Sequence, residues 1–242
     1  MSQLTFTVFG GGGQIAKLFT RLAVQAGHAV NSVIKDDGHQ QELQAIGAKT
    51  HILSLADASV SDLASLLETT CPDVVLFSAG AGGKPPGPNI IDYQGAVKVF
   101  DALEQSPVQR LIYVGAVDVR SRDKPFPDWY DEEDKLNSGK YWEAIGSYMQ
   151  AKLDAELDLH TRTSIDYTVL RPGMLTPEPA AGVNLGKLHI GKTSRELIAK
   201  VALAVATTPG TKGLTIDVMD GEGTVNGELK KVVSHKIDAW TG

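Results

Sequence analysis

The stretch Leu4-Thr-Phe-Thr-Val-Phe-Gly-Gly-Gly-Gly-Gln-Ile-Ala16 decides how the rest of the sequence is interpreted. A short apolar run leads directly into four consecutive glycines, and an amphipathic segment follows them. This order predicts a strand, a tight turn and a helix. Glycines at such a turn let backbone amides approach a phosphate without interference from Cβ atoms, and the helix dipole favours negative charge. The stretch therefore predicts a site for the diphosphate of a dinucleotide.

The glycine run allows two registers of the dinucleotide-binding motif. One is Gly10-x-x-Gly13-x-x-Ala16, and the other starts at Gly11 and follows the more common G-x-G-x-x-G/A spacing. In both, Ala16 is the small residue that lets the helix pack close to the strand. A flexible glycine-rich turn without a ligand is the alternative. The cofactor contacts expected from this stretch are Gly10, Gly12, Gly13, Gln14 and Ile15.

The composition is that of an ordinary globular protein, with 42% hydrophobic and 21% charged residues in a chain of 242. No apolar run is long enough to span a membrane, and the N-terminus carries no secretory signal, so we expect a cytoplasmic protein that does not bind membranes. The net charge of −6 without a basic stripe argues against nucleic-acid binding. The single cysteine, Cys71, cannot form an intramolecular disulfide, and we interpret it as a packing residue.

Apolar runs and helical stretches alternate along the chain, which is typical of a parallel sheet with helices on both faces. We expect a single α/β domain over 1–242, with a Rossmann doubly wound parallel sheet of about seven strands in the order 3-2-1-4-5-6-7. Thr193 is expected to cap the last helix, with Glu196 as its capping-box partner. The strands are expected at 4–9, 29–34, 50–53, 73–78, 110–114, 166–170 and 214–218. The helices are expected to begin near Gly13, Gln40, Ser59, Asn89, Tyr141 and Thr193.

Two segments without clear periodicity follow predicted strands, at the edge of the sheet where open α/β folds bind ligands. Residues 79–88 are rich in Gly and Pro, and residues 116–140 mix charged with aromatic side chains. We interpret 116–140 as a substrate or lid loop, with a solvated surface loop as the alternative. The C-terminal segment, 174–242, is expected on the substrate side of the site.

The second predicted strand ends in Val-Ile-Lys35-Asp36-Asp, at the position that meets the adenosine ribose in dinucleotide-binding folds. Lys35 is placed to neutralise a 2′-phosphate, whereas Asp36 is placed to accept from a free 2′-hydroxyl. Because the first polar residue after the strand is basic, the sequence favours NADPH over NADH. A surface lysine beside surface acids is the alternative.

Two further strand ends supply expected cofactor contacts. Asp57 follows the third predicted strand, where a carboxylate or its flanking amides can meet the adenine amino group, and a helix cap is the alternative. Ser78, Ala79 and Gly80 end the fourth predicted strand, beside the first in the expected order. Their small side chains allow close approach of a ribose or a nicotinamide.

Tyr148 and Lys152 are the candidate catalytic residues. Their four-residue spacing places the phenol and the ammonium on one helix face. An ordinary tyrosine has a pKa of about 10, and a nearby positive charge stabilises its phenolate. Lys152 supplies that charge and is placed to hydrogen-bond the nicotinamide ribose as well. The pair alone is a weak signal, but it follows the fifth predicted strand, where the chemistry is expected.

Further motifs are Asp92-Tyr-Gln-Gly-Ala96, Glu156, Leu170-Arg-Pro-Gly173 and Ser194-Arg-Glu196. Together with the glycine turn, Lys35, Asp57, Ser78-Ala-Gly80 and Tyr148-x-x-x-Lys152, they cover nearly the whole chain. They resemble the short-chain dehydrogenase/reductase superfamily, in its atypical NAD(P)-binding branch that includes biliverdin reductase B-like and nitrogen-metabolite-regulator-like proteins.

The resemblance implies the register Gly10, Gly13, Ala16. It also implies that Tyr148 exchanges the substrate proton while a hydride moves at the nicotinamide. In relatives, the turn that corresponds to Pro172 and Gly173 passes beside the nicotinamide ring. Arg171, just before this turn, fits a buried ion pair as well as a ligand contact.

The sequence departs from the superfamily after the fifth predicted strand. Gly115 and Ala116 stand where a serine positions the carbonyl in relatives, and Asp118 or Ser121 are the substitutes to consider. We therefore carry two hypotheses. The first is an NAD(P)H-dependent oxidoreductase that reduces a small carbonyl, quinone-like or flavin-like substrate. The second is a non-catalytic NAD(P)-sensing regulatory protein. The histidines show no metal-ligand spacing, so we expect no metal, and we expect a monomer or a homodimer.

Overall fold

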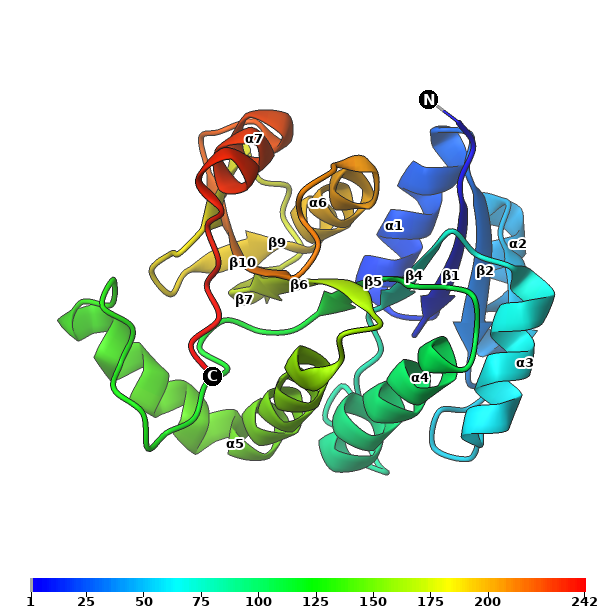
Figure 1. Ribbon diagram of the computed structural model, residues 1–242, viewed down its shortest axis with the longest axis horizontal. Coiled ribbons are helices and arrows are strands. Elements are labelled where there is room, and N and C mark those ends of the chain that lie inside the picture. The colour runs from blue at the N-terminus through cyan, green and yellow to red at the C-terminus, as the bar shows by residue number, and fades with distance from the viewer. Residues whose placement is uncertain (1) are drawn as a thin grey trace.

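The computed structural model describes residues 2–242 and has an eight-stranded sheet at its centre (Figure 1). Its strands are β1 (Thr5–Phe9), β2 (Ala29–Ile34), β3 (Lys49–Ile52), β4 (Val74–Phe77), β5 (Arg110–Val114), β6 (Asp166–Pro172), β8 (Gly182–Gly186) and β10 (Leu214–Gly221). The order is β3-β2-β1-β4-β5-β6-β10-β8. The run from β3 to β10 is parallel throughout and confirms the predicted sheet. The antiparallel edge strand β8 is an addition that the sequence analysis missed.

Helices cover both faces of this sheet. They are α1 (Gln14–Gln25), α2 (Gln40–Ile46), α3 (Val60–Thr70), α4 (Gly95–Glu104), α5 (Glu132–Thr161), α6 (Arg195–Thr207) and α7 (Val225–His235). In Figure 1, α1, α6 and α7 lie on one face, and α3, α4 and α5 lie on the other. A short 3₁₀ turn, η1 (Asp37–His39), precedes α2, and a π-helical turn, η2 (Asn89–Gln94), precedes α4.

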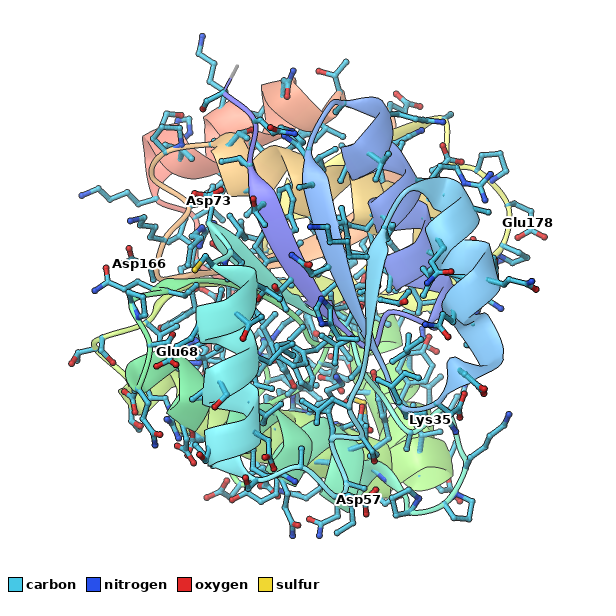
Figure 2. All side chains as sticks on the ribbon, turned by 90° about the vertical axis from the view of Figure 1, so that its right-hand side faces the viewer. Lys35, Asp57, Glu68, Asp73, Asp166 and Glu178 are labelled. Atoms are coloured by element: carbon cyan, nitrogen blue, oxygen red, sulfur yellow. The ribbon has the colours of Figure 1, made fainter. Side chains whose placement is uncertain are left out.

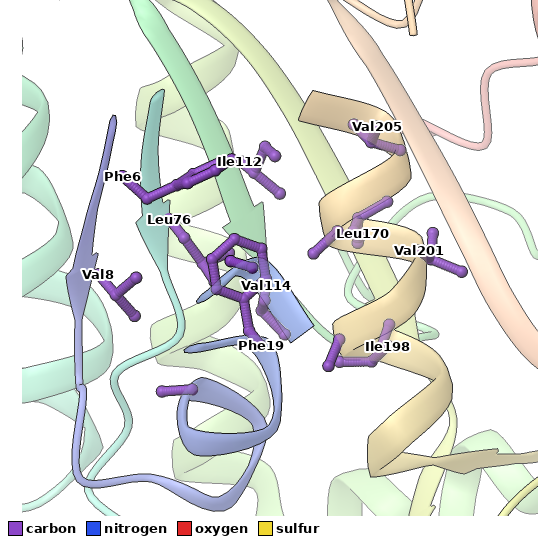
Figure 3. Packing of buried hydrophobic residues seen from close by; sticks show 14 of the residues in the cluster. Phe6, Val8, Phe19, Leu76, Ile112, Val114, Leu170, Ile198, Val201 and Val205 are labelled. Carbon is purple, nitrogen blue, oxygen red and sulfur yellow. The ribbon is translucent and has the colours of Figure 1, made fainter. Parts of the chain in front are cut away.

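The core consists of two apolar layers that result from the period-two alternation of strand side chains. On β5, Ile112 packs with Phe6 and Phe19 on the α1 and α6 side (Figure 3), whereas Tyr113 packs with Phe77 on the α3 and α4 side. All five side chains are fully buried. Each burial of this kind stabilises the fold by about 1.5–3 kcal/mol. The sheet is therefore a rigid frame from which the loops at its carboxyl edge project.

Two predictions about the ends of helices are wrong. Thr193 lies in a short strand, β9 (Lys192–Ser194), which pairs with β7 (Met174–Thr176) in a separate two-stranded sheet. Its hydroxyl donates to the carbonyl of Val218 at 2.5 Å, so Ser194 and not Thr193 precedes the helix. Cys71 is exposed, because it ends α3 in the left-handed conformation instead of packing in the core.

The segment 116–140 is a loop only as far as residue 131. Helix α5 begins at Glu132, because Asp131 and Asp134 form a capping box in which the Asp131 side chain accepts from the Asp134 amide at 2.9 Å. The backbone leaves the helical conformation at Ile145, so α5 consists of two segments joined by a kink. That kink, and not the helix start, lies near the Tyr141 position at which the sequence predicts the helix to begin.

The described residues contain no helix with the length and apolar character that crossing a bilayer requires. The interpretation of the loop as a lid and the expected monomer or homodimer stay predictions. What the fold does establish is a shared carboxyl edge for β1, β2, β4, β5 and β6, where the candidate site residues gather.

Candidate functional site

The glycine turn joins β1 to α1 in a conformation that only glycine adopts easily. Gly10 has φ +80°, and a Cβ atom there would lie 2.5 Å from Cα of Ala79. The Gly13 amide donates to the carbonyl of Gly10 at 2.8 Å, which closes the turn. Gly13 precedes α1, and within residues 2–242 no side chain caps this helix. The first N–H groups of α1 are therefore available to an anion, as the cradle for a diphosphate requires.

A side chain at Gly12 would meet a different neighbour, the exposed side chain of His39. A Cβ atom at this position would overlap the imidazole of His39, which comes from the turn η1 after β2. His39 in turn lies 3.2 Å from Nζ of Lys17, and Lys17 pairs with Glu42 at 2.5 Å. The imidazole thus lies beside the glycine turn, at the cavity that both line. Sequence analysis missed His39, because a lone histidine in a polar turn carries no motif.

One half of the cavity at the carboxyl edge lies over β1, β2 and β4. Lys35, Asp36, His39 and Lys84 are its charged and titratable lining residues. Asp36 Oδ1 accepts from the Gly38 amide at 3.1 Å, so this carboxylate is engaged as the cap of η1. Its other oxygen lies 3.8 Å from Nζ of Lys35, which is 78% exposed. The most available cations of this half are therefore Lys35 and Lys84.

Asp57 is not part of the lining. It is exposed, and its neighbours Leu55 and Ala56 face the cavity instead. The cap of the following helix is Ser59, so the alternative interpretation of Asp57 as a cap is wrong, whereas a cofactor contact at Asp57 or its flanking amides stays a prediction. Figure 2 shows Lys35 and Asp57 at one end of the sheet and Asp73, which precedes β4, at the other.

The other half of the cavity lies over β4, β5 and β6. It shares Gly13, Ser78, Ala79 and Gly80 with the first half, so the two form a continuous groove. The structure brings together in this half the predicted residues Gln14, Ile15, Tyr148, Lys152, Pro172 and Gly173. Predicted residues from both ends of the chain thus line one groove.

Lys152 is held more tightly than its predicted role suggests. It is buried, and its ammonium donates to the carbonyl of Val114 at 3.1 Å. It also lies 3.3 Å from Oδ1 of Asp92, in an ion pair whose geometry is not that of a hydrogen bond. Burial by itself lowers the pKa of Lys152. Tyr113, Asp92 and Tyr148 together raise it by more than burial lowers it, so the net pKa lies above the ordinary value. Lys152 is therefore a permanent cation.

Tyr148 does not have the lowered pKa that the pairing with Lys152 suggests. Burial raises the pKa of this phenol, and the positive charge of Lys152 opposes that rise without cancelling it. Asp92 and Glu156 add to the rise, because their negative charges disfavour a phenolate. The ammonium of Lys152 lies 5.8 Å from the centre of the Tyr148 ring. Tyr148 is thus a protonated phenol at the groove, and a weaker acid than an ordinary tyrosine.

Gly115 is explained by a buried ion pair behind the groove. Arg171 donates to Oε2 of Glu156 at 2.6 Å and 2.9 Å, which confirms the ion-pair interpretation of Arg171. The second oxygen, Oε1, is buried and lacks a hydrogen-bond partner among residues 2–242. A Cβ atom on Gly115 would overlap that oxygen. The position where relatives carry a serine is therefore closed to any side chain.

Neither proposed substitute for the missing serine lines the groove. Asp118 is buried, bound to Nε of Arg120 at 3.0 Å and to the indole of Trp142 at 3.1 Å. The Ser121 amide donates to the C-terminal carbonyl of Gly242. Neither residue is part of the groove lining around Tyr148, so neither is placed to replace the serine hydroxyl. Ala116 lines the groove without offering a hydroxyl.

One group of residues with metal-ligating atoms lies outside the groove. His189 comes close to Asp131 and Asp134, a grouping that the spacing of the histidines did not reveal. Asp134 already accepts from His189 at 2.6 Å and from the Ile190 amide at 2.7 Å. Its negative charge raises the pKa of His189, chiefly through that hydrogen bond. These contacts connect the start of α5 to the 187–190 segment, so we assign the group a structural role.

Sequence analysis missed several residues of the second half of the groove. Asp92 belonged to a motif without an assigned role, and the signal available was one acid in the otherwise uncharged run 89–97. Arg195 was likewise quoted only as part of a motif. The apolar lining carries no motif, because scattered apolar residues have the same pattern as a core. It comprises Val117, Ile145, Met149, Met174 and Leu175.

Comparison with known proteins agrees with this geometry. UPF0659 protein C216.03 of Schizosaccharomyces pombe is 40% identical over 221 residues, which are 89% of this chain and 90% of that protein. The oxidoreductase ylbE of Lactococcus lactis has a similar structure, with a TM-score of 0.80 at 21% identity over 96% of this chain and 98% of that one. ChuY, an anaerobillin reductase of Escherichia coli O157:H7, has a TM-score of 0.72 at 21% identity over 90% of this chain and 98% of its own.

The two solved structures show that the fold is shared. A family profile described as NAD(P)H-binding also indicates a ligand. It matches residues 10–209, a range that includes both halves of the groove. The match begins at the first glycine of the turn and ends after α6. It agrees with the resemblance of the motifs to atypical short-chain dehydrogenases/reductases. The chain therefore belongs to this NAD(P)H-binding family.

Proposed function

We propose that this protein is an NADPH-dependent reductase of a small carbonyl, quinone-like or flavin-like compound. The observation that carries the proposal is the continuous groove, which leads from Lys35 past the glycine turn to Tyr148. Its length places a basic residue at one end and a proton donor at the other. The name of one structural neighbour, an anaerobillin reductase, supports a reduction as the reaction class.

The residues of the groove fit a nicotinamide dinucleotide phosphate. The uncapped start of α1 and the glycine turn would hold the diphosphate. Lys35 and Lys84 would pair with the 2′-phosphate, since Asp36 is engaged with the Gly38 amide. Bound NADPH supplies a hydride. Preference for NADPH over NADH follows from the two available lysines.

Tyr148 would donate the proton that the reduced oxygen of the substrate takes up. The phenol is protonated at neutral pH, so the donor is present before substrate binds, and because its pKa is raised the proton transfer depends on the positive charge of Lys152. Lys152 would stabilise the phenolate left behind, because its ammonium is a permanent cation near that ring. Asp92 and the Val114 carbonyl hold the lysine in place. The roles of these residues are positioning and proton transfer.

The experiment that tests this proposal compares Tyr148→Phe with Tyr141→Phe. Both tyrosines line the same half of the groove, so the second variant controls for loss of a hydroxyl there. NADPH oxidation is followed against a panel of quinones, aldehydes and flavins, and NADPH affinity is measured by fluorescence titration. We expect Tyr148→Phe to lose about 10²–10⁴-fold in turnover with unchanged NADPH affinity, and Tyr141→Phe to keep its turnover. Equal turnover of the two variants would overturn the assignment.

A second candidate function is an NAD(P)-sensing regulatory protein. The observation that favours it is the closed Gly115 position, which leaves the carbonyl of a substrate without the usual serine hydroxyl. An oxyanion donor is worth about 3 kcal/mol of the barrier. NADPH binding at the groove with no turnover on any member of the panel would favour the sensor.

A further inference from the structure

The half of the groove that holds Tyr148 contains one charge without a partner. Its charged lining residues are Asp92, Lys152 and Arg195. Asp92 and Lys152 pair with each other at 3.3 Å. Throughout residues 2–242, the guanidinium of Arg195 has neither an ion pair nor a hydrogen bond to a side chain or carbonyl. This half of the groove therefore carries one uncompensated positive charge.

The acids that lie near Arg195 in the sequence and the fold are engaged elsewhere. Glu196, the next residue, pairs with Lys200 at 2.6 Å. Asp220 accepts from the amide of Ser194 at 2.7 Å. Neither carboxylate neutralises the guanidinium. A half-buried arginine without a partner loses hydration and gains nothing in return, so a bound anion would recover free energy there.

The fold places Arg195 at the same cavity as an apolar wall. Strand β9 pairs with β7, with Thr193 opposite Leu175, and α6 starts with Arg195 directly after β9. Met174 on β7 and Ile145 at the kink of α5 are 50% and 46% exposed, although both are large apolar side chains. Exposed apolar surface at a cavity is typical of a ligand site. The wall and the guanidinium line the same space as Tyr148.

We propose that Arg195 binds a carboxylate of the substrate, whose apolar body lies against Met174 and Ile145. This inference rests on the proposed function and adds the substrate class, an anionic apolar compound. The planar fork of an arginine suits a carboxylate, because two parallel N–H groups can donate to its two oxygens. A lysine at this position would keep the charge and lose that fork.

The test measures binding to the protein saturated with NADP⁺, so it does not depend on turnover. The probes are 2-naphthoate and 2-naphthamide, which have the same aromatic body and differ in charge. The variants are Arg195→Gln, Arg195→Lys and Arg21→Gln. Arg21 is exposed on α1, so Arg21→Gln makes the same change in net charge away from the groove. Affinities are measured by calorimetry, together with the affinity of each variant for NADP⁺ and ADP-ribose.

We expect wild type and Arg21→Gln to bind 2-naphthoate about tenfold more tightly than 2-naphthamide, and Arg195→Gln to bind the two alike. Arg195→Lys should fall between them. Equal affinities in wild type would overturn the inference. So would an Arg195→Gln protein with weakened binding of NADP⁺ and ADP-ribose, since Arg195 would then hold the cofactor diphosphate. A wild type that binds NADP⁺ but prefers the amide contradicts only this inference, whereas one that binds no NADP⁺ overturns the proposed function with it.

Discussion

The two halves of the groove differ in the exposure and pairing of their lysines. In the half over β2, Lys35 is exposed and only loosely paired with Asp36 at 3.8 Å, so its charge is available to a ligand. In the half over β5, Lys152 and Asp92 are buried and paired with each other. The first half therefore resembles a binding surface, whereas in the second half folding and chemistry depend on the same side chains. Substitution of Lys35 should therefore lower affinity, whereas substitution of the buried Asp92 should lower stability.

The largest effect is expected for Asp92→Ala. It would leave the buried ammonium of Lys152 without its counterion and the Ala81 amide without its acceptor at 2.9 Å. Removing one partner of a buried ion pair costs about 3–5 kcal/mol of the free energy of unfolding. Urea unfolding measures the loss, with Asp57→Ala as the exposed control. If Asp92→Ala loses no more free energy of unfolding than Asp57→Ala, the importance of the buried pair is contradicted.

A smaller loss is expected for Gly115→Ser. The new Cβ would overlap Oε1 of Glu156, whose other oxygen is fixed by Arg171. Forcing a side chain into a packed site costs about 1–3 kcal/mol. The matched variant is Ala116→Ser, which adds a hydroxyl one residue later in the same lining of the groove. Thermal unfolding should show a lower Tm for the first variant only. The same Tm for both would mean that Glu156 moves aside at little cost.

Asp217, a buried carboxyl on β10, gives the stability of the protein a pH dependence. Burial, with smaller contributions from Glu156 and Asp118, raises the pKa of this carboxyl from 3.8 to about 7. Between these values the folded protein keeps a proton that the unfolded chain releases, so the contribution of Asp217 to stability is lost as pH rises toward 7. The slope is about 1.4 kcal/mol per pH unit at most.

Asp217→Asn removes this titration and keeps an acceptor for the Leu188 amide. Urea unfolding of both proteins between pH 5 and 8 measures the difference. We expect wild type to lose stability relative to the variant as pH rises toward 7. A difference in the free energy of unfolding that is the same at every pH would show that Asp217 titrates at its ordinary value.

The smallest effect on stability, and a clear effect on affinity, is expected for Lys35→Ala. The lysine is 78% exposed, so its loss should change the free energy of unfolding by less than about 0.5 kcal/mol. NADPH binding should weaken about tenfold, equivalent to about 1.4 kcal/mol, while NADH binding stays the same. Fluorescence titration measures both, with Lys49→Ala as the control at another exposed lysine. Equal weakening of both nucleotides would place Lys35 away from the 2′-phosphate.

The same contrast explains what the sequence analysis could predict. The glycine turn, the parallel strands and the Tyr148–Lys152 spacing are local patterns, and each has a direct relation between spacing and geometry. The pairing of Lys152 with Asp92 joins distant segments, so no local spacing reports it. The sequence analysis therefore predicted correctly that Lys152 lowers the pKa of Tyr148. It overestimated the size of this effect, because burial and Asp92 raise the same pKa.

Errors at the edges of elements have a similar cause. The capping box of Asp131 and Asp134 starts α5 within a segment interpreted as a loop, because its aspartates lie among other charged residues. Cys71 was placed in the core from its neighbours, although the end of α3 turns it outward. In both cases the backbone conformation of one or two residues decides the outcome, and composition does not encode it.

A titration of the wild-type protein with NADPH and with NADH tests most directly whether the groove binds NADPH. Nicotinamide fluorescence reports both affinities in the same experiment. We predict that both bind, with NADPH about tenfold tighter because Lys35 and Lys84 are available to its 2′-phosphate. Tighter binding of NADH would contradict the assignment of the two lysines. Absence of binding by either nucleotide would contradict the account of the groove as a whole.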